Sequence, residues 1–141
     1  MVAQAVRSAI VTIATARRTT FMSELTIYHN PACSKSRETL ALIKASGHEP
    51  RVVEYLKTPP SEAELAAIVR KLDIRPLELV RRNEQIFKDK YAGRNLGDKE
   101  WIKAMIEHPI LMQRPIVVRG EAAVIGRPPE DVKPLLKSSS A

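Results

Sequence analysis

The chain has 141 residues, enough for one compact domain with its own core. Its 44% hydrophobic and 28% charged residues are typical of a soluble globular domain and exclude a disordered or fibrous chain. No apolar run approaches the ~20 residues that span a bilayer, so we expect no membrane partner.

The formal net charge of +7 is unevenly distributed. Residues 1–21 contain Arg7, Arg17 and Arg18 and no acidic residue, so the rest of the chain has a modest basic excess. It lacks the aromatic-interleaved basic stripe of proteins that bind single-stranded nucleic acid. The charge suits a small anionic substrate at least as well as a polynucleotide, and we expect no nucleic-acid partner.

Cys33 is the single cysteine of the chain. One cysteine excludes an internal disulfide, a cysteine zinc cluster and a Cys-x-x-Cys pair. A lone free thiol fits a reducing compartment, so we expect a cytoplasmic protein. Any redox chemistry at Cys33 requires a second thiol from another molecule.

Residues 1–21 allow three interpretations, because they are rich in Ala, Val, Thr and Arg and lack acids. They could form a targeting peptide, a short accessory helix, or an extension from an upstream start codon. We favour the extension, with the functional domain covering residues 22–137 and a loose tail at residues 138–141.

The first elements predict a β-α-β unit. Residues 25–28 read as a strand that stops at the turn signal Asn30-Pro31. Residues 34–46 read as a helix with Gly47 as its C-terminal cap, and residues 51–55 as a second strand. Such a unit is normally parallel and right-handed.

Helical patterns follow. Ser61 and Glu64 form a capping box that opens a helix to about residue 72. Residues 76–82 and 98–107 also read as helical, and Pro109 ends the second stretch.

The end of the chain predicts a hairpin and a helix. Residues 116–118 and 122–125 read as short strands on either side of Gly120. Pro128 starts a last helix to about residue 136. The complete order is that of an α/β thioredoxin-like fold. We expect a mixed four-stranded sheet flanked by helices on both faces, with a helical insertion at about residues 58–108 between strands 2 and 3.

Cys33 lies between the first strand and the first helix. A thiolate at a helix N-terminus is stabilised by free backbone N–H groups and the helix dipole, which lowers a cysteine pKa. Lys35 and Arg37 add positive potential. The alternative is a small buried hydrophobic residue, but the polar, tightly turned loop favours a reactive thiol.

Several spaced segments resemble one family. The loop YHNPACSKSR at residues 28–37 is similar to the active-site loop of glutaredoxin-coupled arsenate reductases. The resemblance continues through residues 54–60, 79–83, 108–118 and 126–128, and residues 1–21 lie outside it.

The resemblance implies roles for individual residues. Cys33 is the nucleophile, and Ser36 hydrogen-bonds its thiolate. His29 favours the thiolate, with a purely structural histidine in the turn as the alternative. Three arginines bind the oxyanion and its covalent adduct, because guanidinium groups offer paired donors and a permanent charge. A proline held in cis lies opposite the cysteine. The arginines and the proline are Arg81, Arg114, Arg127 and Pro115.

The resemblance also implies a reaction. The Cys33 thiolate attacks arsenate, glutathione attacks next, and arsenite is released after glutaredoxin resolves a mixed disulfide on Cys33. We expect no bound cofactor and no metal, with glutathione as the reducing co-substrate and arsenate, glutathione and glutaredoxin as partners. One alternative is a family member with another substrate. The other is an Spx-type regulator that binds RNA polymerase, which typically has a cysteine where this chain has Ser36.

Overall fold

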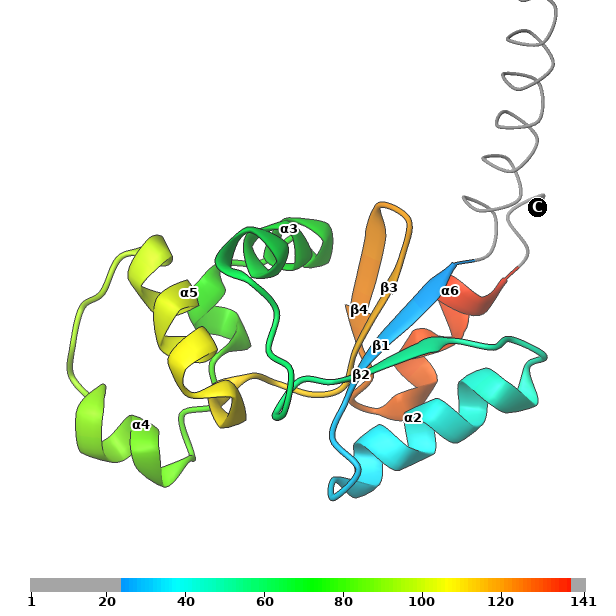
Figure 1. The fold of residues 1–141 in the computed structure, drawn as a ribbon, viewed down its shortest axis with the longest axis horizontal. Helices are drawn as coiled ribbons and strands as arrows, with labels where there is room; N and C mark the ends of the chain where they lie inside the picture. Colours follow the sequence, from blue (N-terminus) through cyan, green and yellow to red (C-terminus); the bar gives the residue numbers. More distant parts are fainter. Residues whose placement is uncertain (1–23, 138–141) are drawn as a thin grey trace, which may run out of the picture.

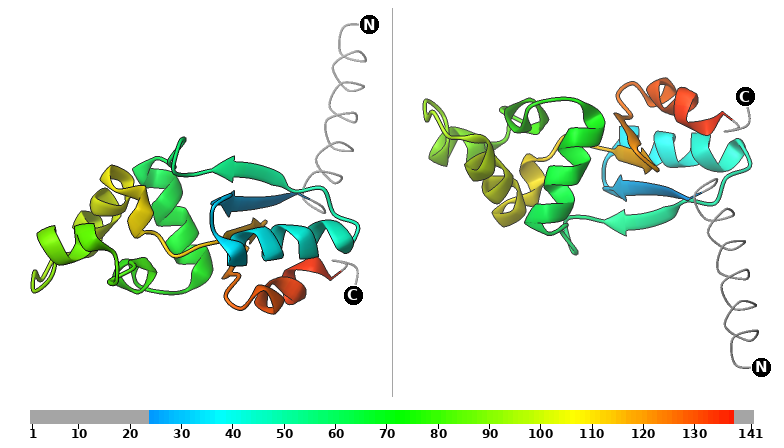
Figure 2. Two further views of the ribbon diagram at one scale, coloured as in Figure 1. Left: turned by 90° about the horizontal axis from the view of Figure 1, so that it is seen from below. Right: turned by 90° about the horizontal axis from the view of Figure 1, so that it is seen from above.

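A computed structural model describes residues 24–137 of the chain (Figures 1 and 2). The expected N-terminal extension at residues 1–21 and the tail at residues 138–141 lie outside the described residues. The boundaries of the domain therefore stay a prediction. In Figure 1 the described residues form a sheet covered by α2 and α6, with the helices α3 to α5 gathered at one end of that sheet.

The sheet has four strands in the order β2-β1-β3-β4, and it confirms the expected mixed topology. β1 and β2 are parallel, while β3 pairs antiparallel with both β1 and β4. β2 ends one residue before the expected Tyr55. The strands are β1 (Leu25–His29), β2 (Arg51–Glu54), β3 (Ile116–Arg119) and β4 (Ala122–Ile125).

Helices on one face of the sheet cover a small hydrophobic cluster. Alternate residues of a strand point to the same face of the sheet, so the apolar ones form a continuous surface there. α2 (Ser34–Ala45) and the last helical turns, up to Leu136, pack against that surface. The last turns form a 3₁₀ helix, η3 (Pro129–Val132), and then α6 (Lys133–Leu136), where one continuous helix was expected. Pro134 lacks the N–H group that a continuous helix would bond to the carbonyl of Glu130. The fully buried residues of this cluster are Leu25, Ile27, Ile43, Val117 and Val132.

The helical insertion between β2 and β3 begins as predicted. Ser61 and Glu64 form the capping box of α3 (Glu62–Leu72): Glu64 N donates to Ser61 Oγ at 3.1 Å, and Ser61 N donates to Glu64 Oε1 at 2.8 Å. The rest of the insertion consists of η1 (Pro76–Leu79), α4 (Gln85–Lys90), α5 (Asp98–Glu107) and η2 (Pro109–Leu111).

Two expectations in the insertion are wrong. The helix expected over residues 76–82 is a 3₁₀ turn that ends at Leu79, because Val80 then pairs with Met112 in an isolated antiparallel bridge. α4 was not expected; none of its six residues is buried, so its apolar pattern is weak.

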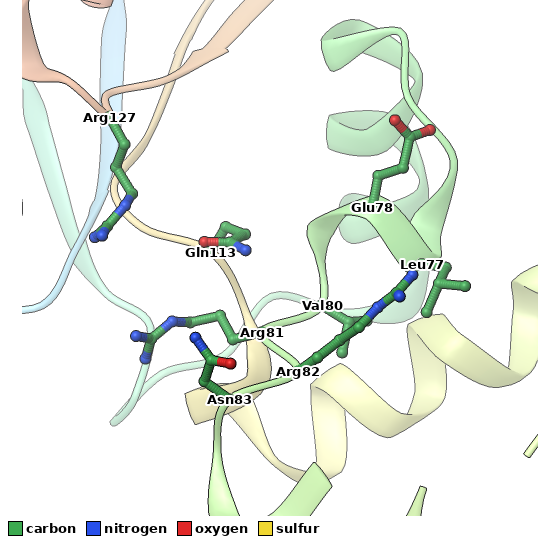
Figure 3. Close-up of a pocket in the computed structure, with 8 residues that line it drawn as sticks. All are labelled: Leu77, Glu78, Val80, Arg81, Arg82, Asn83, Gln113 and Arg127. Atoms are coloured by element: carbon green, nitrogen blue, oxygen red, sulfur yellow. The ribbon is translucent and has the colours of Figure 1, made fainter. Parts of the chain in front are cut away.

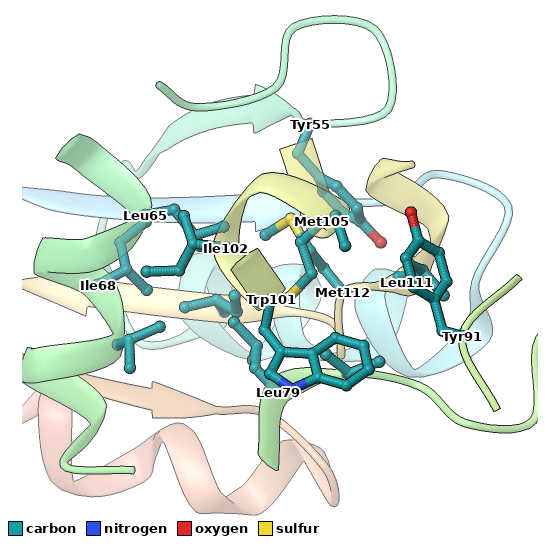
Figure 4. Close-up of a cluster of buried hydrophobic side chains, with 14 residues drawn as sticks. Tyr55, Leu65, Ile68, Leu79, Tyr91, Trp101, Ile102, Met105, Leu111 and Met112 are labelled. Atoms are coloured by element: carbon teal, nitrogen blue, oxygen red, sulfur yellow. The ribbon is translucent and has the colours of Figure 1, made fainter. Parts of the chain in front are cut away.

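The insertion has its own hydrophobic core, which also covers the second face of the sheet (Figure 4). Trp101 stacks on Phe87 with ring centroids 6.0 Å apart, and the fully buried Met105 lies one helical turn further along α5. Leu79 and Met112 belong to the same core. The Val80–Met112 bridge therefore belongs to a well-packed core, which restrains the backbone of Arg81 and Gln113 that follow it.

Candidate active site

Cys33 is the N-cap residue of α2, where the sequence placed it. Asn30 builds the turn before it: Asn30 Oδ1 accepts from Ala32 N, and Asn30 O accepts from Cys33 N, both at 3.0 Å. Cys33 O then accepts the first helical bond, from Arg37 N. Only 9% of Cys33 is exposed, so the thiol is close to the surface but enclosed on most sides.

His29 and Ser36 form a buried pair beside this turn. His29 Nδ1 lies 2.6 Å from Ser36 Oγ, and Ser36 Oγ also accepts from Asn30 N at 3.0 Å. Burial lowers the pKa of His29 and outweighs the opposing effect of Glu54, so the neutral imidazole is favoured. The structure brings the two predicted residues together, and in residues 24–137 no hydrogen bond joins either of them to Cys33 Sγ.

Arg81 follows the Val80–Met112 bridge directly. Its backbone N donates to Leu111 O at 2.6 Å, and this hydrogen bond fixes the position of the Arg81 backbone. The guanidinium forms an ion pair with Glu84, and only 19% of the Arg81 side chain is exposed. Arg81 is therefore a positioned cation with one carboxylate partner.

Arg114 precedes Pro115, and the peptide bond between them is cis, as predicted. Two of its guanidinium nitrogens, Nε and Nη1, are buried and have no hydrogen-bond partner in the structure. A buried charged donor without a partner is costly, because it has lost water and gained no acceptor. Arg114 therefore presents a vacant donor set for an anion.

Arg127 is brought close to Pro115 by the glycine before it. Gly126 N donates to Pro115 O at 2.9 Å. A Cβ at residue 126 would lie 2.7 Å from Thr39 Oγ1 on α2, so only glycine allows this approach. The Arg127–Pro128 bond is also cis, which the sequence analysis did not anticipate.

Arg81 and Arg127 line one cavity of about 510 Å³ between the insertion and the sheet (Figure 3). In Figure 3 both guanidinium groups lie on the same side of this cavity, and Gln113 lies between their backbones. Cys33 and Arg114 are not among its lining residues, although Arg114 follows Gln113 in the chain. The structure thus unites two of the three predicted arginines in one cavity, and the third does not line that cavity.

Tyr55 is a residue that the sequence analysis missed. The parallel register pairs His29 with Glu54, so Tyr55 lies beside Asn30 where β1 runs into the Cys33 turn. Its hydroxyl is buried without a hydrogen-bond partner; Asn30 approaches it outside normal hydrogen-bond geometry. Burial raises the pKa of Tyr55, the Cys33 thiolate raises it further, and Arg81 lowers it. Tyr55 therefore lies within electrostatic reach of both Cys33 and Arg81.

Residues 24–137 contain no helix with the length and apolar character of a membrane span. Within the same range, no three His, Cys, Asp or Glu side chains are grouped as ligands for a metal ion. The polar side chains around the Cys33 turn are the amide of Asn30 and the hydroxyls of Ser36 and Tyr55, and Arg81 and Arg127 supply cations in the neighbouring cavity.

The motifs that surround this site match a known family over most of the chain. Residues 28–135 match the ArsC family, and they include the Cys33 turn, the insertion and all three arginines. The chain belongs to the ArsC family. The expected resemblance is therefore confirmed at the level of the family.

Two bacterial relatives match most of this chain. The protein named Uncharacterized protein YfgD of Escherichia coli K12 is 48% identical over 111 residues, which is 77% of this chain and 93% of that protein. An Arsenate reductase of Rhizobium meliloti 1021 is 45% identical over 113 residues, 79% of this chain and 81% of that protein.

A solved structure agrees with the sequence relatives. The Arsenate reductase from Vibrio cholerae has a TM-score of 0.76 at 45% identity, and the match covers 80% of this chain and 97% of that chain. Together with the strand order, this likeness confirms the thioredoxin-like α/β fold.

Proposed function

We propose that this ArsC protein is an arsenate reductase with Cys33 as its nucleophile. The observation that carries the proposal is Arg114, whose buried Nε and Nη1 have no partner and which directly follows Gln113 of the cavity that Arg81 and Arg127 line. A tetrahedral oxyanion supplies acceptors for such donors. Relatives at 45% and 41% identity are named Arsenate reductase, which supports arsenate as the oxyanion.

Each of the remaining site residues has a proposed role. Arg81, Arg114 and Arg127 hold the oxyanion, and the α2 N-terminus places Cys33 Sγ for attack on arsenic. His29 and Ser36 favour the thiolate indirectly: their mutual hydrogen bond fixes the turn whose geometry sets the Cys33 backbone. They act as positioning residues.

The proposed reaction moves two electrons from external thiols to arsenic. The Cys33 thiolate forms an S–As bond and hydroxide or water leaves arsenate. A glutathione thiolate then attacks Cys33 Sγ; an S–S bond forms and the electron pair of the S–As bond stays on arsenic, which leaves as arsenite. Glutaredoxin then reduces the resulting Cys33–glutathione disulfide, so arsenite leaves before glutaredoxin acts, and not after it as the resemblance implied. The single cysteine of the chain requires that both resolving thiols come from other molecules, which also supports a cytoplasmic, reducing location.

A coupled assay tests this function. The purified protein is mixed with arsenate, glutathione, glutaredoxin, glutathione reductase and NADPH, and NADPH oxidation and arsenite are measured. We expect turnover that depends on arsenate, on glutaredoxin and on Cys33, with Cys33→Ser inactive. Phosphate in place of arsenate is the control. Absence of arsenate-dependent turnover contradicts the arsenate assignment, and activity without glutaredoxin contradicts the proposed thiol donor.

A further inference from the structure

The cavity beside the arginines is larger than the reaction's oxyanion requires. Its volume is about 510 Å³, which falls within the ~300–1,000 Å³ typical of sites for ligands with many more atoms than arsenate. Arg81 and Arg127 occupy one side of it, and the remaining lining residues come from the insertion and from Gln113. A second ligand can therefore lie next to the oxyanion.

Two opposite charges mark the other side of this cavity. In Figure 3 the side chains of Glu78 and Arg82 lie on the side away from Arg127. The two groups form no ion pair with each other, and within the described residues the Arg82 side chain has no hydrogen bond or ion pair. Glu78 Oε2 accepts from Arg75 N at 2.8 Å, which fixes the carboxylate and leaves Oε1 available. A fixed carboxylate and a guanidinium group with no partner in residues 24–137 thus lie on the same side of the cavity.

Separated opposite charges of this kind are complementary to a zwitterion. A free α-amino acid group carries a carboxylate for Arg82 and an ammonium for Glu78. Peptide amides can bond to the side chains of Asn83 and Gln113, which also line the cavity. The reaction needs a thiol from outside, because Cys33 has no cysteine partner in the chain.

We propose that this cavity binds the thiol co-substrate, with Arg82 and Glu78 holding the α-amino acid head of a γ-glutamyl peptide thiol. The thiol end of the bound peptide then faces Arg81 and Arg127, the arginines to which the proposed function assigns the oxyanion. This inference rests on the proposed function, since it assigns the position of the thiol that the reaction consumes.

Binding of an unreactive ligand tests the inference apart from turnover. Cys33→Ser protein is titrated with S-methylglutathione and, separately, with N-acetyl-S-methyl-cysteinylglycine, which lacks the γ-glutamyl head and has no ammonium group. Calorimetry or chemical-shift changes report affinity. We expect Arg82→Ala and Glu78→Gln to weaken S-methylglutathione binding by about threefold or more. Glutamine at residue 78 still accepts from Arg75 N, so the fold is kept. Neither change affects the truncated ligand.

A matched exposed arginine is the control. Arg70, on α3, does not line the cavity, and Arg70→Ala leaves S-methylglutathione affinity unchanged. In the Cys33 enzyme, Arg82→Ala raises KM for glutathione and not for arsenate. The inference is overturned if the protein binds S-methylglutathione and the truncated ligand equally well. It is also overturned if Arg82→Ala and Arg70→Ala proteins have the same affinity for S-methylglutathione. If binding behaves as expected but arsenate is not reduced, the proposed function fails and the peptide-thiol site stands.

Discussion

Ser36 Oγ lies 2.6 Å from His29 Nδ1 and at the same time accepts from Asn30 N at 3.0 Å. One hydroxyl therefore ties the last residue of β1 and the start of the cysteine turn to the first turn of α2. Ser36 is fully buried, so water cannot replace these bonds.

Ser36→Ala tests this connection. The change leaves a backbone N–H and an imidazole without their partner in a buried place, which costs about 1–3 kcal/mol. We expect the free energy of unfolding to fall by that amount in urea titrations and the rate of Cys33 alkylation to change. Ser34→Ala is the control, because Ser34 is exposed and its side chain forms no hydrogen bond within the described residues. Equal stability of the two variants contradicts the structural role of the Ser36 hydroxyl.

The lowered pKa of His29 makes stability depend on pH. Burial is the main cause of the shift, and Arg37 and Lys44 add to it. Below about pH 6.5 the unfolded chain gains a proton on His29 while the folded chain does not, so the contribution is complete above that pH and is lost as pH falls through the folded pKa. We expect His29→Gln to flatten the fall in unfolding free energy between pH 7 and pH 5. An unchanged slope shows that another group is responsible.

The vacant donors of Arg114 predict how the protein responds to anions. Arsenate should raise the thermal midpoint, because a ligand at 100 times its Kd adds about 2.7 kcal/mol to the free energy of unfolding. Arg114→Leu removes this response. In the absence of anion the variant is as stable as the parent or more so, because an unpaired buried charge is replaced by an apolar group. Arg70→Leu should keep the full anion response; a normal response in Arg114→Leu excludes Arg114 from the site.

Of the glycines in the described residues, Gly126 is the one where an added methyl group should lower stability most. Its Cβ would lie 2.7 Å from Thr39 Oγ1 and 3.1 Å from Pro115 Cγ, so Gly126→Ala forces β4 away from α2 at a cost of about 1–3 kcal/mol. The displacement also moves Arg127, so arsenate affinity falls with stability. Gly97→Ser is the control, since its Cβ meets Glu100 Oε1 at an ordinary 3.6 Å. If Gly126→Ala protein keeps its arsenate affinity, the position of Arg127 does not depend on the close contact between Gly126 and Thr39.

Tyr55→Phe removes a buried hydroxyl that has no partner in the ligand-free protein. Since the unpaired group is unfavourable, we expect the free energy of unfolding to stay constant or to rise by about 1 kcal/mol. Tyr28→Phe is the comparison, because the Tyr28 hydroxyl is not buried without a partner. A clear loss of stability on Tyr55→Phe shows that the hydroxyl is bonded in solution.

The sequence predicted the fold well where local signals and burial agree. The capping box at Ser61 and the hairpin around Gly120 are local devices, and both elements are present where expected. Residues 80–82 were assigned to a helix because their composition allows one. The bridge from Val80 to Met112 overrides that preference, and a partner 32 positions away gives no local signal.

The same distinction holds for the site. Cys33 and Ser36 were placed by a continuous motif, and the arginines by resemblance alone. Tyr55 and Arg82 lie inside segments 54–60 and 79–83, which carry the family resemblance, but that resemblance assigned neither residue a role. Tyr55 is significant only through the parallel pairing of β2 with β1, and Arg82 only through the cavity that the insertion forms against the sheet.

Glu84 gives Arg81 a carboxylate partner only three residues away. An arriving anion therefore does not meet a bare cation at this position; it competes with an acid that is tethered to the same loop. A singly charged anion interacts with Arg81 no more strongly than Glu84 does, so it gains little by displacing Glu84. A doubly charged tetrahedral anion interacts more strongly with Arg81 and can displace the carboxylate. Displacement of Glu84 from Arg81 therefore favours a doubly charged tetrahedral anion over chloride or a single carboxylate.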